Sequence, residues 1–262
     1  MQMETLILQR LEEVEAGHHV KILFAVESGS RAWGVASEHS DYDVRFVYIH
    51  PPEWYLSIDD KRDVIEVPID GLLDMYGWDI RKALKLFRKS NPPLLEWLES
   101  GIIYHDNHGF RAEMLALKPD IFSPKACMHH YLSMAKRNFD SLRHGEQANL
   151  KKYFNVLRPL LSCLWIQKQH VSPPIVFEVL VDHLLPSSSD VRREVYELIN
   201  SKKSGVETEL NSRNDAIHAF VTEQLVELTE YANSVAVEQQ DHTDELDRLY
   251  RKHLVLAWGK EV

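Results

Sequence analysis

Two aspartates one residue apart, Asp41 and Asp43, are the side chains of this 262-residue chain best suited to chemistry. An apolar run, Val44–Ile49, follows them and predicts a strand that begins with the pair. Because residues two apart on a strand point to the same face, both carboxylates would enter one site. Such close negative charges repel each other unless a cation lies between them, and Mg²⁺ binds one or two carboxylates together with substrate phosphates. The pair therefore predicts a magnesium site, although an isolated Asp-x-Asp more often lies on a solvated strand edge.

A small-residue turn shortly before the acidic pair strengthens this prediction. Gly29 and Ser30 follow an apolar run, Val20–Val26, and open a short predicted helix. Backbone N–H groups at such a turn, together with the positive end of the helix dipole, favour a bound phosphate. Gly29 lets the backbone approach closely, and Ser30 adds a hydroxyl donor. A phosphate-binding turn about ten residues before an acidic pair that could hold a metal is a specific combination.

The strings that carry these residues resemble the signature of the DNA polymerase β-like nucleotidyltransferase superfamily. They are GSRAWG, SDYDVRF and GWDIRKAL, with WYLSI and RDVIE between the last two. Within that superfamily they are most similar to bacterial nucleotidyltransferases assigned to an RNA-repair pathway. The likeness is strong over roughly residues 20–100 and weaker to about residue 165. It implies a small mixed-sheet head like the polymerase β palm, an NTP substrate, two Mg²⁺ or Mn²⁺ ions and an RNA end as acceptor.

A third carboxylate usually completes such a site, and the superfamily places it on a later strand that adjoins the first pair. We predict Asp79 for this role, at the end of a hairpin strand in the GWDIRKAL string. Glu66 and Asp74 compete on the same hairpin, and Asp79 has the alternative role of capping the helix that follows. In this scheme Asp41 and Asp43 hold the ion on the triphosphate. Asp79 joins them at the second ion and accepts the proton of the attacking hydroxyl.

Four residues of the head are predicted to lie near the phosphates. Ser30 and the backbone after Gly29 would hold the β- and γ-phosphates. Arg31 either contributes to this contact or faces solvent from the first turn of its helix. Arg45 lies two residues after Asp43 on the same strand face, where it either neutralises a phosphate or balances the carboxylates.

The second half of the chain is predicted to contribute residues that bind the nucleotide. In related nucleotidyltransferases, a helical domain contributes a lysine and an aromatic residue to the triphosphate and base, and Lys151, Lys152 and Tyr153 resemble that element. Arg158 is seven residues after Lys151, so the two share a helix face. The alternative for Tyr153 is an ordinary core aromatic. All four are predicted nucleotide-binding residues.

The charge of the chain constrains its partners. The formal net charge is −10, which argues against nucleic-acid binding driven by bulk charge. The segment Lys125–His170 is different, with eight Lys or Arg against Asp140 and Glu146, a net charge of +6. This segment either faces a triphosphate or RNA backbone, or is a solvated helix face.

Composition and cysteine usage indicate a globular chain in a reducing setting. Hydrophobic residues make up 44% and charged residues 27% of the chain, which is ordinary for a globular protein. No apolar run approaches the length of a membrane span, and the N-terminal segment predicts an acidic amphipathic helix instead of a signal peptide. Cys127 and Cys163 do not form a C-x-x-C motif and are predicted core thiols. We therefore expect a cytoplasmic protein without a membrane partner.

Hydrophobic periodicity predicts an α+β chain in which an α/β head, residues 1–110, precedes an all-helical domain, residues 111–262. The resemblance implies that the head is the nucleotidyltransferase domain. In the head, strands are predicted at 18–26, 41–49, 64–69 and 72–79. Asp70-Gly71 between the last two predicts a hairpin turn. The helices are predicted at 3–16, 29–35, 80–89, 94–99, 111–117, 125–143, 149–169, 174–185, 190–202, 216–237 and 243–257.

These features together predict a Mg²⁺-dependent nucleotidyltransferase. It would transfer a nucleoside monophosphate from an NTP to an acceptor hydroxyl, with RNA as the acceptor that the resemblance implies. A protein hydroxyl or a small molecule is the first alternative acceptor. A non-catalytic nucleotide-binding or antitoxin-like interaction protein is the second alternative, and three retained acids would count against it.

Overall fold

The computed structural model describes residues 2–143, 150–205, 214–236 and 241–259. Glu146 and the predicted helix ends at Asn149 and Val237 lie outside the described residues. The strands are β1 (Lys21–Glu27), β2 (Tyr42–Ile49), β3 (Val64–Asp70), β4 (Leu73–Asp79) and β5 (Ile103–Asp106). The helices of the head are α1 (Gln2–His18), α2 (Gly29–Ala32), α3 (Pro52–Tyr55), α4 (Ile80–Arg88) and α5 (Pro92–Glu99). The later helices are α6 (Phe110–Ile121), α7 (Pro124–Arg143), α8 (Leu150–Gln169), α9 (Phe177–Leu184), α10 (Asp190–Lys203), α11 (Asp215–Ser234) and α12 (Thr243–Trp258).

The five strands form one mixed sheet in the order β3-β4-β2-β1-β5. Only β2 and β4 pair in parallel, and the other three neighbouring pairs are antiparallel. The predicted hairpin is confirmed, since β3 and β4 are joined at Gly71, whose φ of +60° suits glycine. Because β2 and β4 run side by side in the same direction, the beginnings of both strands lie at one end of the sheet. The α+β class is therefore confirmed, with a mixed sheet as predicted.

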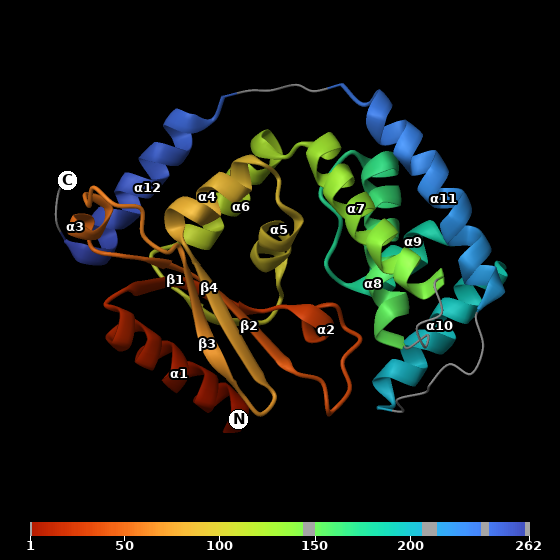
Figure 1. Cartoon of the computed structure of the whole chain (residues 1–262), viewed down its shortest axis with the longest axis horizontal. Helices are drawn as coiled ribbons and strands as arrows, with labels where there is room; N and C mark the ends of the chain where they lie inside the picture. Colours follow the sequence, from red (N-terminus) through yellow and green to blue (C-terminus); the bar gives the residue numbers. More distant parts are fainter. Residues whose placement is uncertain (1, 144–149, 206–213, 237–240, 260–262) are drawn as a thin grey trace.

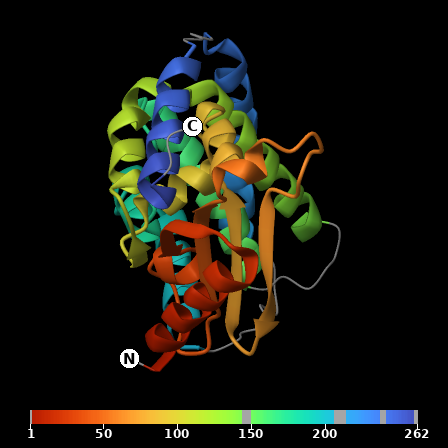
Figure 2. The same ribbon diagram turned by 90° about the vertical axis from the view of Figure 1, so that its left-hand side faces the viewer.

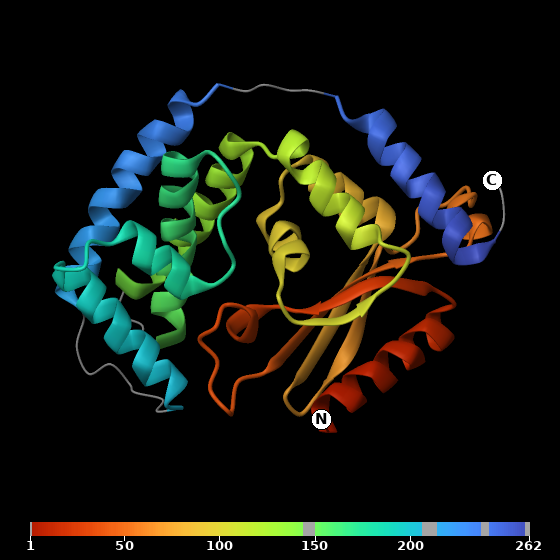
Figure 3. The same ribbon diagram turned by 180° about the vertical axis from the view of Figure 1, so that it is seen from behind.

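The sheet separates two hydrophobic cores. On one face, α1 packs through Ile7, Leu11 and Val14 against alternate residues of β1, β2 and β4. On the other face, α4, α5 and α6 cover the sheet, and the larger core continues from them into the later helices. Figures 1 and 3 show this arrangement, with α1 below the sheet and the helical part to one side of it. The buried face that points away from α1 is the one that carries the acidic residues described below.

Two elements of the head do not follow from the sequence pattern. Residues 52–55 form the short helix α3 where a loop was expected, and β5 was not expected at all. β5 is a four-residue edge strand whose residues are only partly buried, so it lacks the alternation of apolar and polar residues that marks a half-buried strand. The first helix also extends to His18, which we had expected to begin a strand.

The helices α7 to α11 form a compact group beside the head. α7 and α8 lie along each other, α11 packs on both, and Cys127 and Cys163 are buried between them, which confirms the predicted core thiols. A buried ion pair joins this group to the head, because Arg158 of α8 contacts Glu96 of α5 at 2.8 Å. None of the helices in the described ranges is both long and apolar enough to cross a bilayer.

The end of the chain returns to the head. α12 lies against α4 rather than against the other late helices, as Figures 1 and 2 show. The ring of Tyr250 meets Tyr55 of α3 edge-on at 5.3 Å between centroids, and Lys252 and His253 both contact Glu113 of α6. The division at residues 110 and 111 stays a prediction, but α12 itself is part of the packing of the head.

The buried pair gives a stability prediction. We expect Arg158→Ala to lower the free energy of unfolding by about 3–5 kcal/mol, because Glu96 would keep a charge without its cation in a buried position. Urea unfolding followed by circular dichroism measures the change. The double variant Arg158→Met/Glu96→Leu removes both charges and should lose far less. Equal losses in the single and double variants would contradict this account.

Candidate active site

The start of β2 and the start of β4 bring two carboxylates together. The parallel register places Asp43 directly opposite Asp74. One nitrogen of Arg45, Nη2, donates to Asp43 Oδ1 and to Asp74 Oδ2, at 2.8 Å each. The same guanidinium donates through Nη1 to the carbonyls of Val44 and Asp74. Arg45 therefore balances the carboxylates, which was one of the two roles expected for it, and the two oxygens converge on a single cationic group.

The glycine turn packs directly on this acidic pair. Gly29 has a φ of +60°, and a Cβ atom added there would lie 2.0 Å from Asp43 Oδ2. The neighbouring Ser28 donates its backbone N–H to the carbonyl of Asp43 at 2.8 Å. The turn begins the four-residue helix α2, so Ser30 and the backbone N–H groups after Gly29 lie at the same end of the sheet as Asp43. The structure thus brings together the predicted turn and the second residue of the predicted acidic pair.

A further carboxylate, Glu27, lies under the site and was missed by the sequence analysis. It is fully buried at the end of β1, and its Oε1 accepts the backbone N–H of Asp43 at 2.7 Å. The hydroxyl of Tyr104 on β5 donates to Oε2. Burial raises the pKa of Glu27, and its hydrogen bonds with Tyr104 and Asp43 oppose the shift. A charged residue at the end of an apolar strand, two residues before Gly29, was the signal in the sequence.

The surroundings of Asp43 disfavour the negative charge of its carboxylate. Its pKa is raised, mainly because it is partly buried. Arg45 opposes this shift, whereas the nearby charges of Asp74 and Asp41 add to it. Lys151 of α8 also lowers the pKa of Asp43, so α8 approaches the acidic end of the sheet. A carboxylate with these neighbours gains from any further cation that binds there.

Asp41 and Arg31 form the loop edge of the site. Asp41 is exposed just before β2. Arg31 donates to the backbone carbonyls of Ser40 at 2.7 Å and Asp41 at 3.1 Å, and its guanidinium lies 3.6 Å from the ring centroid of Tyr42. Arg31 therefore fixes the loop that presents Asp41. The expectation that it contacts phosphate stays a prediction.

The structure does not place Asp79 beside the acidic pair. Asp79 lies opposite Tyr48, five residues further along β4 than Asp74, which is roughly 17 Å at about 3.3 Å per residue. Its side chain is fully buried, caps α4 by accepting the N–H of Arg81 at 2.8 Å, and accepts the hydroxyl of Tyr55 at 2.6 Å. Its predicted position is wrong and the capping alternative is correct. The strand was predicted correctly, but Asp74 is the acid on it that meets Asp43.

The predicted residues of α8 separate into two groups. Lys151 is exposed and Lys152 partly buried at the start of the helix. Tyr153 is 1% exposed and accepts the backbone N–H of Asn214, so it is the core aromatic of the alternative reading. Arg158 is 3% exposed. It pairs with Glu96 and lies 4.2 Å from the ring of Trp33, so the expectation that it binds nucleotide is also corrected. Only the two lysines at the start of α8 are left as candidates.

Aromatic rings continue the acidic face along β4. Tyr76 and Trp78 alternate with buried residues after Asp74, so the three share one face of the sheet. The guanidinium of Arg45 lies 4.1 Å from the ring centroid of Tyr76, and Trp78 stacks on Trp97 at 3.9 Å. Both rings of β4 stay partly exposed. Their place was not recognised in the sequence, because it depends on the pairing of β4 with β2.

The acidic pair is suited to a divalent cation. Asp43 and Asp74 supply hard oxygen donors from two strands, and both already converge on one nitrogen of Arg45, which stands in for a bound cation. Across the described part of the chain, no group of three or more His, Cys, Asp or Glu side chains is arranged to hold a metal. The site thus offers two converging carboxylates, with Asp41 near them on the loop.

A small mixed sheet with paired carboxylates beside a Gly-Ser turn, followed by helices, defines a protein of the DNA polymerase β-like nucleotidyltransferase class. The model of one family in that class, RlaP, described as the RNA repair pathway DNA polymerase beta family, matches residues 3–252. The chain belongs to this family.

Known proteins that are similar to the chain include a bacterial relative and a solved structure. It is 44% identical to the uncharacterized protein YcgL of Bacillus subtilis over 256 residues, which cover 98% of both chains. A solved structure of a nucleotidyltransferase-like protein from Exiguobacterium sibiricum, at 12% identity and a TM-score of 0.33, aligns with 94% of this chain and 79% of its own.

Proposed function

We propose that this protein is a Mg²⁺-dependent nucleotidyltransferase that moves a nucleoside monophosphate from an NTP to an acceptor hydroxyl, most favourably the end of an RNA strand. The observation that carries the proposal is the convergence of Asp43 and Asp74 beside the turn at Gly29. In the reaction, the acceptor oxygen forms a bond to the α-phosphorus. The bond from that phosphorus to the bridging oxygen breaks, and pyrophosphate leaves.

The side chains at this end of the sheet have distinct roles in the proposal. Asp43 and Asp74 hold the cation, with Asp41 as a further donor from the loop. When bound, Mg²⁺ supplies charge neutralisation for the phosphates and lowers the pKa of a coordinated hydroxyl. Asp74 accepts the proton of the acceptor hydroxyl, a role that needs a carboxylate within hydrogen-bond reach. Arg45 keeps the two carboxylates aligned until a stronger cation binds.

The turn and α8 are proposed to bind the triphosphate. Ser30 and the backbone after Gly29 meet the β- and γ-phosphates, at the end of the sheet where Asp43 lies. Lys151 approaches from α8 with a positive charge that acts on Asp43, and Lys152 follows it in the same turn. The partly exposed rings of Tyr76 and Trp78 offer apolar faces for a base beside the carboxylates.

RNA is the proposed acceptor because the description of the family refers to an RNA repair pathway. A protein hydroxyl and a small molecule remain alternative acceptors for the same chemistry. The paired carboxylates favour catalysis over a non-catalytic binding role, since a binding module has no need to hold two acids against each other in a partly buried position.

A transfer assay tests the proposal. The protein is incubated with each of four α-³²P-labelled NTPs, with Mg²⁺ or Mn²⁺, and with separate pools of RNA, protein and small-molecule acceptors. We expect label on RNA, release of pyrophosphate and loss of both in EDTA. Label on protein or a small molecule alone would replace the RNA acceptor. Retained NTP binding without transfer to any acceptor would refute the enzymatic function.

A further inference from the structure

The helix α4 is unusually basic for this chain. Residues 80–89 contain five Lys or Arg and no Asp or Glu, in a protein whose net charge is −10. Its apolar side is buried in the core through Ile80, Ala83, Leu84 and Phe87. The cations therefore gather on the remaining surface of the helix. The proposed transfer reaction makes no use of them.

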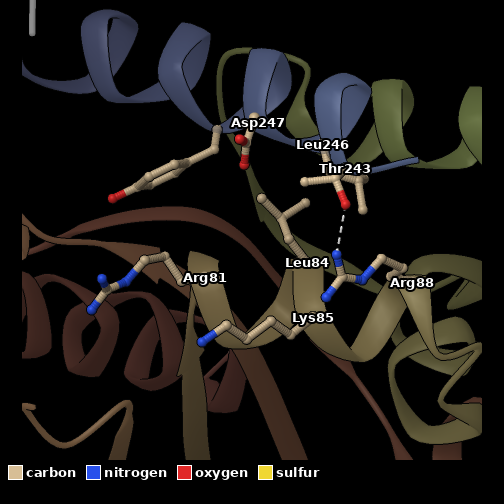
Figure 4. Close-up of a pocket in the computed structure, with 8 residues that line it drawn as sticks. Arg81, Leu84, Lys85, Arg88, Thr243, Leu246 and Asp247 are labelled. Carbon is tan, nitrogen blue, oxygen red and sulfur yellow. Dashed lines mark hydrogen bonds between the residues drawn. The ribbon is translucent and has the colours of Figure 1, made fainter. Parts of the chain in front are cut away.

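Three of these cations line a cavity of about 180 Å³ between α4 and α12. They are Arg81, Lys85 and Arg88, at the spacing that places side chains along one face of a helix. Leu84 and Leu246 supply apolar lining. Figure 4 shows the three cationic side chains on α4 and the nearby face of α12. We refer to this cavity as the α4–α12 groove.

The cations of the groove have few anionic partners. Neither Lys85 nor Arg88 lies within ion-pair distance of a carboxylate in the described part of the chain. Arg88 instead donates to the hydroxyl of Thr243 at 2.8 Å. The one acidic residue that lines the groove, Asp247, has its own cation, Arg251, at 3.8 Å. Arg81 lies 4.0 Å from the buried carboxylate of Asp79, and Arg88 helps to lower the pKa of Asp241. Lys85 and Arg88 are therefore the groove cations without a direct carboxylate partner among the described residues.

The arrangement of these charges favours a strand over a small anion. Arg81 and Arg88 are seven residues apart, roughly 10 Å along the helix, which matches about three nucleotides at about 3.4 Å each. A site for one phosphate needs donors that converge on a point, whereas these side chains form a row. We propose that the α4–α12 groove binds the phosphodiester backbone of single-stranded RNA, the acceptor of the proposed function.

The position of the groove fits an acceptor strand rather than the reacting end. Arg81 of the groove is two residues after Asp79. Asp79 is roughly 17 Å from Asp74 along β4, at about 3.3 Å per residue. At about 3.4 Å per nucleotide, this distance corresponds to roughly five nucleotides. The inference rests on the proposed function in naming RNA, but binding itself requires neither NTP nor metal.

Fluorescence anisotropy with a labelled 20-nucleotide single-stranded RNA, without NTP or divalent metal, tests the proposal. We expect Lys85→Glu/Arg88→Glu to raise the Kd at least about tenfold at low salt. The slope of log K against log salt should fall by roughly 1.4, for two lost phosphate contacts. Both side chains are exposed, and Lys85→Gln/Arg88→Gln, which adds no negative charge, should show the same change in slope.

Two control variants separate local binding from other effects. Lys168→Glu/Lys202→Glu makes the same change in net charge at an exposed position of α8 and a partly exposed position of α10, and should keep the Kd within about twofold. Thr243→Val removes the hydrogen bond to Arg88 but keeps the cation, and should keep RNA affinity. Loss of affinity in these controls equal to that in the groove variants would overturn the proposal.

Competition identifies the class of ligand. Pyrophosphate or ATP that displaces the RNA from the wild-type groove but not from the glutamate variant would assign the groove to a free phosphate ligand. An acidic peptide of equal charge that competes as well as unlabelled RNA would assign it to a protein partner. Either result would overturn the assignment to RNA. If RNA binding depends on the groove but no label transfer occurs, only the proposed enzymatic function fails.

Discussion

Replacing Asp74 by asparagine is expected to lower the rate of nucleotidyl transfer by about a hundredfold to a thousandfold, while Asp79→Asn leaves it within about twofold. Asp74 lies opposite Asp43 and shares the same Arg45 nitrogen with it, so its charge is part of the cation site. Asparagine keeps the shape of the side chain but not the second negative charge. Asp79 caps α4, and asparagine caps helices about as well as aspartate.

Single-turnover rates with saturating NTP and Mg²⁺ measure this difference. Asp43→Asn serves as the positive reference and should lose about as much as Asp74→Asn, because the two acids act as one unit. Thermal unfolding of each variant shows whether a loss of rate follows from a loss of structure. A rate that collapses in Asp79→Asn but survives in Asp74→Asn would reverse the assignment of the third carboxylate.

What the sequence predicts well is local along the chain. The acidic pair and the turn at Gly29 are recognised because they lie close together in the sequence and consist of residue types with a clear chemical role. The hairpin at Gly71 follows from a dipeptide turn between two apolar runs. The class of fold follows from the change in periodicity along the chain. Each of these depends on neighbours within a few residues, which is the range over which patterns are informative.

The third acid depends on a pairing that sequence does not reveal. Hairpin residues 64–79 offer three acids of similar plausibility, Glu66, Asp74 and Asp79. Choosing among them requires the register of β4 against β2, strands that are separated in the chain by α3, a loop and β3. A carboxylate before a helix is also a common helix cap. The position of Asp79 before α4 is therefore explained by capping and does not indicate a catalytic role.

The predicted nucleotide-binding residues of α8 also show that sequence spacing does not reveal burial. Arg158 and Lys151 share a helix face by spacing, yet one is buried against Glu96 and the other is exposed. Spacing places both side chains on one side of α8, but it does not say where the head covers that side. The burial of Glu27 has the same origin, because only the packing of β5 and β2 around it encloses its carboxylate.

The second large effect is expected at Gly29. Gly29→Ala should lower the transfer rate at least about a hundredfold, because its Cβ would lie 2.0 Å from Asp43 Oδ2 and push that carboxylate out of place. The φ of +60° adds strain of about 1–3 kcal/mol to any other residue there. Both effects act in the variant, so the rate must be compared with a variant that carries only the strain.

Gly34→Ala is that matched control. Gly34 follows α2 with a φ of +77°, but a Cβ there meets only a side-chain carbon of Val176 at 3.6 Å, which is ordinary contact. It should therefore lose stability to a similar degree as Gly29→Ala in thermal unfolding, while its transfer rate stays close to that of the wild type. If both alanine variants lost the same activity, backbone strain alone would explain the loss. The contact between the turn and Asp43 would then have no separate part in catalysis.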